Sequence, residues 1–148
     1  MLILKYLGGK NNVTQLIQGY RLDGQVSLVF GHQKSQPFQT LLAEMTLTEV
    51  KHYMWCMLRA VEHLASHGIM HRDIKPANFL YDRDTKSGLL IDFGLSELEV
   101  DRETGRPVVN EDVEIAERIA NLQKHLKIKN RIGTKGYMPP EALFSNPE

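Results

Sequence analysis

The strongest hydrophobic pattern in the chain is helical and runs for about twenty residues from Thr46. Thr46 and Glu49 have the spacing of a capping box, in which each side chain bonds a free backbone amide of the first turn. Gly68 supplies a stop signal. We therefore predict a helix here, with Trp55 also packed against the core. Its apolar face would comprise Leu47, Val50, Met54, Met57, Leu58, Val61, Leu64 and Ala65.

The segment before this helix contains a helix end and a hairpin. Residues 1–7 are apolar at helical spacing and stop at a Gly-Gly pair, which predicts the last turns of a helix. Two β-prone runs, 13–21 and 25–30, are separated by a turn that contains Asp23-Gly24, a strong hairpin signal. In the second run Val26, Leu28 and Phe30 alternate with other residues, which indicates one apolar face.

Short apolar segments follow the long helix and alternate with polar turns. Residues 69–70, 79–81 and 89–91 read as small strands around a functional loop, with a turn at 82–88. Residues 97–117 then hold eight acidic and two basic residues, whereas 118–135 hold six basic and no acidic residues. Asn110 could cap a helix in this charged stretch. Its apolar stripe would comprise Val113, Ile115, Ala116, Ile119, Leu122 and Leu126.

Composition narrows the protein class. The 148 residues, of which 42% are hydrophobic and 24% charged, match the usage of a globular domain. Eighteen basic residues balance eighteen acidic ones, which gives no global argument for nucleic acid or an anionic membrane as a partner. A single cysteine, Cys56, excludes an internal disulfide and a cysteine-rich zinc site. No apolar run reaches the length of a membrane span, so we expect a soluble intracellular protein.

Three motifs carry the chemical information. They are His71-Arg72-Asp73-Ile74-Lys75-Pro76-Ala77-Asn78, then Asp92-Phe93-Gly94, and then the run from Gly133 to Glu141 that contains Thr134 and Pro139-Pro140. Their order and spacing resemble the catalytic loop, the metal-binding motif and the end of the activation segment of protein kinases. The resemblance implies an ATP-dependent enzyme with Mg²⁺ as its metal, and a protein as its substrate.

The resemblance also assigns roles to single residues. Asp73 would accept the proton of the substrate hydroxyl, and Asn78 and Asp92 would hold the magnesium ions that bridge the ATP phosphates. Both of these side chains offer oxygen, the ligand atom that Mg²⁺ prefers. Lys75 would lie against the γ-phosphate, as in serine/threonine kinases. Thr134 would close on the catalytic aspartate and lysine.

Spacing from these motifs places the nucleotide base. Phe30 falls where kinases have the residue that guards the back of the adenine pocket. Gly31, His32 and Gln33 fall in the hinge that presents backbone groups to adenine, within residues 31–34. Arg72 resembles an arginine that organises the activation segment around a phosphate or an acidic group. The segment offers as phosphorylatable side chains Ser96, Thr104, Thr134 and Tyr137.

Finer features resemble one kinase family. Leu7-Gly8-Gly9 with Asn12-Val13, Pro37-Phe38, the run 78–81 and the insertion between Asp92 and Gly133 are similar to the cell-division-cycle-seven kinases, which trigger replication origins. The resemblance implies a nuclear location and an activating regulatory subunit, with no direct contact to nucleic acid or membrane. The final motif departs from that family, with Met138-Pro139-Pro140-Glu141 in place of Arg-Ala-Pro-Glu.

The predicted fold is α+β and kinase-like, but incomplete. We expect an N-lobe remnant at 1–30, a hinge at 31–37, a C-lobe with the catalytic loop at 38–95, an insertion at 96–131 and the end of the activation segment at 132–148. No residue of the chain matches the glycine-rich lid or the phosphate-gripping lysine. We therefore expect negligible kinase activity and marginal stability from this polypeptide alone. The alternative is a non-catalytic kinase relative that binds a regulatory subunit or substrate.

One competing site remains. His63, His67 and His71 lie four residues apart, as a metal-binding helix face would place them. Gly68 ends the helix before the third of them, so we reject this hypothesis. His71 is instead interpreted as a packed histidine that supports the catalytic loop.

Overall fold

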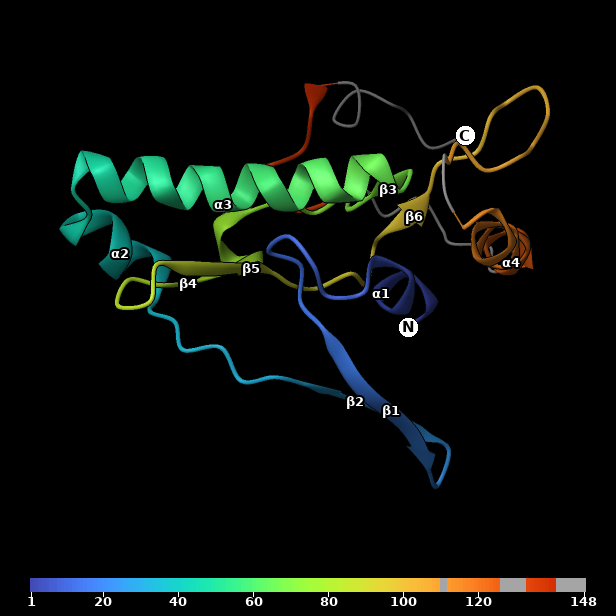
Figure 1. Ribbon diagram of the computed structural model, residues 1–148, viewed down its shortest axis with the longest axis horizontal. Coiled ribbons are helices and arrows are strands. Elements are labelled where there is room, and N and C mark those ends of the chain that lie inside the picture. The colour runs from blue at the N-terminus through green and yellow to red at the C-terminus, as the bar shows by residue number, and fades with distance from the viewer. Residues whose placement is uncertain (110–111, 126–132, 141–148) are drawn as a thin grey trace.

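A computed structural model describes residues 1–109, 112–125 and 133–140. Figure 1 shows a long helix lying along a small strand pair, with a hairpin that projects away from both. The mixture of helices with small antiparallel sheets confirms the predicted α+β class. The elements in order are α1 (Leu2–Leu7), β1 (Leu16–Leu22), β2 (Gln25–Phe30), α2 (Phe38–Glu44), α3 (Leu47–Ser66), β3 (Ile69–Met70), the 3-10 turn η1 (Pro76–Asn78), β4 (Phe79–Asp82), β5 (Ser87–Leu90), β6 (Glu97–Leu98) and α4 (Val113–His125).

The start and end of α3 are those that the sequence predicts. The Thr46 hydroxyl accepts a hydrogen bond from the Glu49 backbone N–H at 3.3 Å, and the Glu49 carboxylate accepts one from the Thr46 N–H at 2.8 Å. Both halves of the capping box are present, so two orphan donors of the first turn are satisfied. The helix stops at Ser66, and Gly68 follows with φ of 61°, in the left-handed region.

The predicted buried face of α3 is only partly correct, because Leu64 is buried and Val50, Met57 and Val61 are half-buried. Leu47 and Leu58 are 71% and 60% exposed, and Met54, Trp55 and Ala65 are exposed as well. The helix instead turns inward a face that carries Tyr53, Cys56, Ala60, His63 and Leu64.

Aromatic packing and close approach decide this orientation. The Tyr53 ring meets the rings of Phe79 and Tyr81 edge-on, at centroid distances of 5.0 and 5.4 Å. A methyl group added at Gly88 of β5 would lie 3.3 Å from Cβ of Cys56. Helix and strand therefore approach closely at this point, and the small residues Cys56 and Gly88 occupy the contact.

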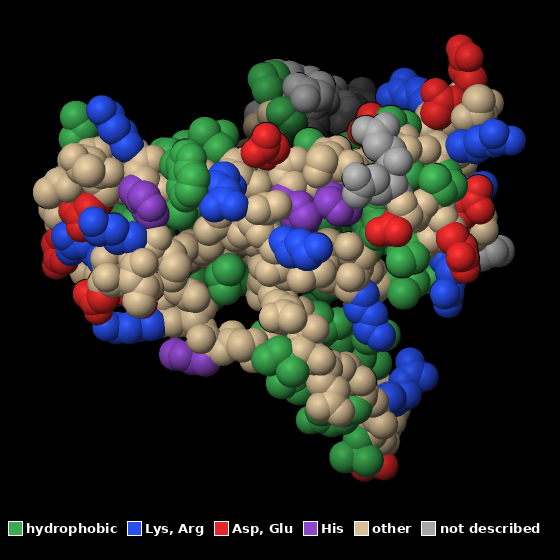
Figure 2. Space-filling view, viewed as in Figure 1, with side chains coloured by type: hydrophobic (Ala, Val, Ile, Leu, Met, Phe, Trp, Pro, Cys, Tyr) green, Lys and Arg blue, Asp and Glu red, His purple; other side chains and the backbone are tan. Residues whose placement is uncertain are grey.

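The hairpin β1–β2 forms as predicted, but its apolar face is not covered. Asp23 and Gly24 both have positive φ, 48° and 79°, as the favoured two-residue hairpin turn requires. The strands pair in antiparallel register from Leu22↔Gln25 outward. Figure 2 shows hydrophobic side chains along this projecting hairpin. The exposed strand residues include Val26, Leu28 and Phe30, so the alternation does not mark a buried face in the described chain.

Two further strand pairs, β4–β5 and β3–β6, include the strands directly before and after the catalytic-loop motif in the chain. Strands β4 and β5 are antiparallel, and Val13 adds a parallel bridge to Leu90 beside them. Strand β3 pairs with β6, which brings the end of α3 next to a segment almost thirty residues later. Tyr81, Leu90 and Val13 are among the most deeply buried side chains. The core therefore lies between α3 and β4–β5, and the loops that join these elements meet at one edge.

The described part of the charged insertion packs against the rest of the chain. Its helix α4 is described from Val113, and the proposed cap Asn110 and the last stripe residue Leu126 lie outside the described residues. Ala116, Ile119 and Ala120 are buried and belong to the same core cluster as residues of α1. Val113, Ile115 and Leu122 are exposed, so only part of the predicted stripe is correct. Figure 1 shows α4 beside α1.

Within the described parts of the chain, no helix combines the length and the apolar character that a bilayer crossing needs.

The capping box predicts a measurable contribution to stability. Thr46→Ala should lower the free energy of unfolding by about 1 kcal/mol, because it leaves a first-turn amide without its acceptor. Urea denaturation followed by far-UV circular dichroism measures this difference. Thr40→Ala in α2 is the matched control, since Thr40 lies inside a helix and is exposed. An equal loss in both variants would contradict the assignment of the cap.

Candidate active site

The catalytic-loop motif leaves β3 and is anchored by His71. This side chain is only 3% exposed, and its Nε2 lies 3.0 Å from the Ile91 carbonyl oxygen. The Asp73 backbone N–H donates to Nδ1 at 3.3 Å, so Nδ1 is an acceptor and Nε2 carries the proton. Burial, the largest effect, lowers the pKa of His71. A neutral histidine thus ties the loop to the strand end before Asp92, as the packed-histidine interpretation predicts.

Backbone strain marks both loops of the site. Arg72 has φ of 68° and Asp92 has φ of 61°, which are left-handed conformations for residues with a Cβ. Each such conformation costs about 1–3 kcal/mol and persists only where the surroundings hold it. At Asp92 the side chain contributes, because its Oδ1 accepts a hydrogen bond from the Gly94 N–H at 3.2 Å.

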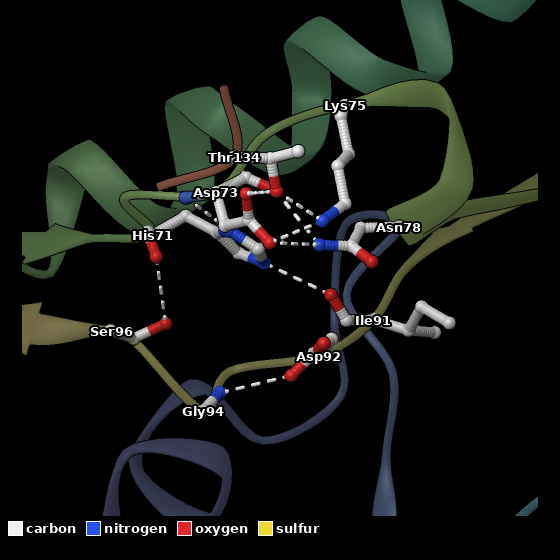
Figure 3. Close-up of polar contacts among 9 residues, drawn as sticks. All are labelled: His71, Asp73, Lys75, Asn78, Ile91, Asp92, Gly94, Ser96 and Thr134. Carbon is white, nitrogen blue, oxygen red and sulfur yellow. Dashed lines mark hydrogen bonds and ion pairs between the residues drawn. The ribbon is translucent and has the colours of Figure 1, made fainter. Parts of the chain in front are cut away.

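Asp73 is the centre of a compact polar cluster (Figure 3). Lys75 Nζ donates to Asp73 Oδ2 at 2.7 Å, and the Thr134 hydroxyl donates to Oδ1 at 2.6 Å. Lys75 Nζ also lies 2.5 Å from Thr134 Oγ1, which closes a triangle of contacts. The Asn78 amide donates to Oδ2 at 3.0 Å and to the Asp73 carbonyl at 2.9 Å. The tertiary structure therefore brings together four residues that span more than sixty positions.

The environment of Asp73 keeps its carboxylate charged. The side chain is 8% exposed, and this burial, the largest single effect, raises its pKa. Hydrogen bonds from Lys75, Thr134 and Asn78 oppose burial and together outweigh it, so the net pKa lies below the ordinary value. Asp73 is accordingly ionised at neutral pH and is a weak base. Such a group is better suited to orienting a hydroxyl than to removing its proton early.

Asn78 and Asp92 come from neighbouring loops joined by backbone bonding. The Ile91 N–H donates to the Asn78 carbonyl at 2.9 Å, directly before Asp92. In Figure 3 the side-chain oxygen of Asn78 points away from Asp73, because the amide nitrogen makes the contact to the aspartate. Asp92 has an exposed carboxylate on the other loop. Both residues thus offer oxygen ligands of the kind that Mg²⁺ prefers.

The histidine metal face has no support in the described residues. His63 Nε2 donates to the Leu7 carbonyl at 2.9 Å, and the His63 ring packs edge-on against His67. His71 is occupied by Ile91 and Asp73. Across residues 1–109, 112–125 and 133–140, no group of three or more His, Cys, Asp or Glu side chains is placed to hold a metal ion.

A cavity of about 500 Å³ lies beside the Asp92-Phe93-Gly94 loop and is open to solvent. Of the residues expected to bind the nucleotide, Phe30, Gly31, Gln33 and Asp92 line it. His32, Lys75 and Asn78 are not among its lining residues. This cavity has the size of a small-molecule site and is mainly apolar, as such sites usually are.

Several residues of the cavity wall were not predicted from the sequence. Leu80 and Leu89 are cross-strand partners in β4–β5 and both face the cavity, whereas Phe79 and Leu90 beside them are buried in the core. The signal was the two-residue alternation along these strands, which puts one face on the core and the other on the cavity. Thr14 and Leu4 complete the wall from distant segments, and no local pattern marked them.

Comparison with known proteins agrees with this geometry. The protein kinase domain family matches residues 1–148, the whole chain. The chain belongs to the protein kinase family. The kinase motifs therefore lie in a kinase fold, and the serine/threonine class is supported by the relatives described next.

Several curated kinases of the cell-division-cycle-seven type are similar to the chain. A probable cell division control protein 7 homolog of Encephalitozoon cuniculi is 42% identical over 67% of the chain and 28% of its own length. The cell cycle serine/threonine-protein kinase hsk1 of Schizosaccharomyces pombe is 33% identical over 96% of the chain and 31% of its own length. The human cell division cycle 7-related protein kinase is 30% identical over 93% of the chain and 24% of its own length. The chain thus spans about a quarter to a third of these kinases.

We predict that the stability of the folded protein depends on pH through His71 of the catalytic loop. Its pKa is lowered in the folded protein, so below about pH 6.5 the unfolded chain binds more protons than the folded one. Stability is fully present above that pH and falls as the pH drops toward the folded pKa. Thermal unfolding at about pH 7.5 and about pH 5.5 should show a smaller decline for His71→Asn than for the unmodified protein.

The matched control for this measurement is His32→Asn, at an exposed position. It should keep the decline of the unmodified protein. An equally steep decline in His71→Asn would show that other groups control the acid transition.

Proposed function

We propose that this protein transfers the γ-phosphoryl group of ATP to serine or threonine hydroxyls of a protein substrate. The observation that carries the proposal is the triangle of Asp73, Lys75 and Thr134, with Asn78 bonded to the same carboxylate. Phosphoryl transfer needs a nucleophile held in line and charge neutralised on the transferred group. A charged carboxylate beside a lysine ammonium meets both needs in one place.

Asp73 would accept a hydrogen bond from the substrate hydroxyl and aim its oxygen at the terminal phosphorus. Its lowered pKa fits a loose transition state, in which the proton leaves late and strong basicity is not needed. Lys75 has its ammonium 2.7 Å from Asp73 and would shield this carboxylate from the negative charge of the phosphate. Thr134 would then hold the end of the activation segment next to these two residues, because it bonds both of them.

The residues present fit a magnesium nucleotide. The Asn78 oxygen and the Asp92 carboxylate would hold the metal, which supplies positive charge to the phosphate oxygens when it is bound. Phe30, Gly31 and Gln33 would border the adenine base in the cavity, and Leu80 and Leu89 would pack against it. We keep His32 as a proposed hinge residue that acts through its backbone.

The wider biological setting follows from the relatives. Their names describe cell-cycle kinases, and we extend that setting to this protein. The same resemblance extends to a nuclear location, an activating regulatory subunit and a protein substrate. The residue ranges given above for the N-lobe, hinge, C-lobe and insertion are part of this proposal.

Replacement of the central carboxylate tests the proposal. In the full-length protein, Asp73→Asn should lower phosphate transfer by about 10²–10⁴-fold, because the hydroxyl loses its charged acceptor. ATP affinity should stay near that of the unmodified protein, since Asp73 does not line the cavity. Radiolabelled phosphate transfer to a casein-type acceptor and binding of a fluorescent ATP analogue measure the two quantities. Asp23→Asn, in the exposed hairpin turn, is the matched control.

Two outcomes would contradict the assigned roles. Loss of transfer and of ATP binding together would show that Asp73 holds the nucleotide or the fold. Nucleotide or partner binding without transfer in the unmodified full-length protein would favour the alternative, a non-catalytic kinase relative.

A further inference from the structure

Arg72 forms an ion pair that the kinase chemistry above does not use. Its guanidinium Nη1 contacts the Glu97 carboxylate, and the two side chains are 17% and 26% exposed. Glu97 lies in β6, three residues after the Asp92-Phe93-Gly94 motif. An ion pair sheltered to this degree is screened less by solvent than a surface pair, and removal of one partner leaves a charge in a poorly solvated place.

Arg72 also contacts the other end of the activation segment. A methyl group added at Gly133 would lie 2.9 Å from the Arg72 carbonyl oxygen, so the two backbones are in close contact. Thr134, the next residue, bonds Asp73, which follows Arg72 in the chain. One residue of the catalytic loop therefore meets the start of the segment through its side chain and the end through its backbone.

The start of the segment is held at the same place by two further contacts. Glu97 pairs with Met70 in the β3–β6 ladder, one residue before His71. The Ser96 hydroxyl donates to the His71 carbonyl at 3.4 Å (Figure 3). Strand β6 has only two residues, so its backbone pairing alone is a weak restraint. The Glu97 to Arg72 contact is the charged component of this restraint.

The candidate phosphorylation sites do not fill the same role in the described segment. Ser96 is buried, and the Thr134 hydroxyl is bonded to Asp73 and Lys75. Thr104 lies in an arm whose turn is closed by the Asp101 carboxylate, and Tyr137 is exposed. Of these described side chains, the carboxylate of Glu97 is the group in ion-pair contact with the Arg72 guanidinium.

We propose that Glu97 is a positioning residue that takes the place of a phosphate group at Arg72. Its fixed negative charge holds the activation segment on the catalytic loop, and the segment needs no phosphorylation to adopt this arrangement. A carboxylate can accept the same charge-assisted hydrogen bonds from a guanidinium that a phosphate does. Since Arg72 neighbours Asp73, the ion pair also fixes the backbone from which the central carboxylate projects. This inference rests on the proposed kinase function.

A double-mutant cycle tests the inference in the full-length protein. Arg72→Gln and Glu97→Gln should each lower kcat by about tenfold and change the KM for ATP by less than about threefold, because the nucleotide cavity is untouched. The double variant should be no slower than either single variant, since both remove the same contact. Glu99→Gln, an exposed acid of the same segment, is the matched control and should keep the unmodified kcat. Phosphatase treatment of the unmodified protein should leave its activity in place.

Three results would overturn the inference. Independent losses that multiply to about a hundredfold in the double variant would show that the two side chains act separately. Loss of activity after phosphatase treatment, restored by a kinase, would show that a phosphate organises the segment. Coupling in the melting temperature with independent losses in kcat would make the pair structural only.

Failure of the proposed function gives a different result. An unmodified full-length protein that transfers no phosphate would refute the kinase proposal, while the same cycle read in melting temperatures would still test the contact. Coupled melting temperatures would support Glu97 as the anion that holds the segment, and uncoupled ones would overturn it.

Discussion

The arrangement of the site depends on the burial of one carboxylate. Asp73 is almost inaccessible to solvent, and an uncompensated charge in such a place costs on the order of several kcal/mol. Lys75, Asn78 and Thr134 supply the compensating donors, and the last of these comes from the far end of the activation segment. The need to satisfy Asp73 therefore joins the catalytic loop to a segment about sixty residues away, and the site and the fold stabilise each other.

The two residues before Asp73, neutral His71 and charged Arg72, hold the catalytic loop to different parts of the structure. His71 is uncharged and links the loop to the strand end at Ile91, where a charged ring would be poorly solvated. Arg72 is charged and meets Glu97 at the start of the segment. The side chains of the two residues before Asp73 thus point in different directions: His71 contacts the strand end before Asp92, and Arg72 contacts β6. This divergence requires the left-handed backbone at Arg72, whose strain the surrounding contacts offset.

Sequence reasoning was most successful where the signal is local. The capping box at Thr46, the stop at Gly68 and the turn at Asp23-Gly24 each depend on a few adjacent residues, and each is present in the structure. It failed for the orientation of α3, where the exposed Leu47 and Leu58 were expected inside. A helical stripe of apolar residues does not reveal which face of the helix meets the strand, and it is Cys56 that approaches Gly88.

The sequence by itself determined the element types, the kinase family and the motif residues proposed for the site, because motif spacing and turn chemistry are local properties of the chain. Only the tertiary structure decided which residues meet. The contact of Glu97 with Arg72 and the meeting of Leu4 and Thr14 with Leu89 in the cavity wall join segments separated along the chain. Such contacts depend on how whole elements pack, and no local pattern encodes their geometry.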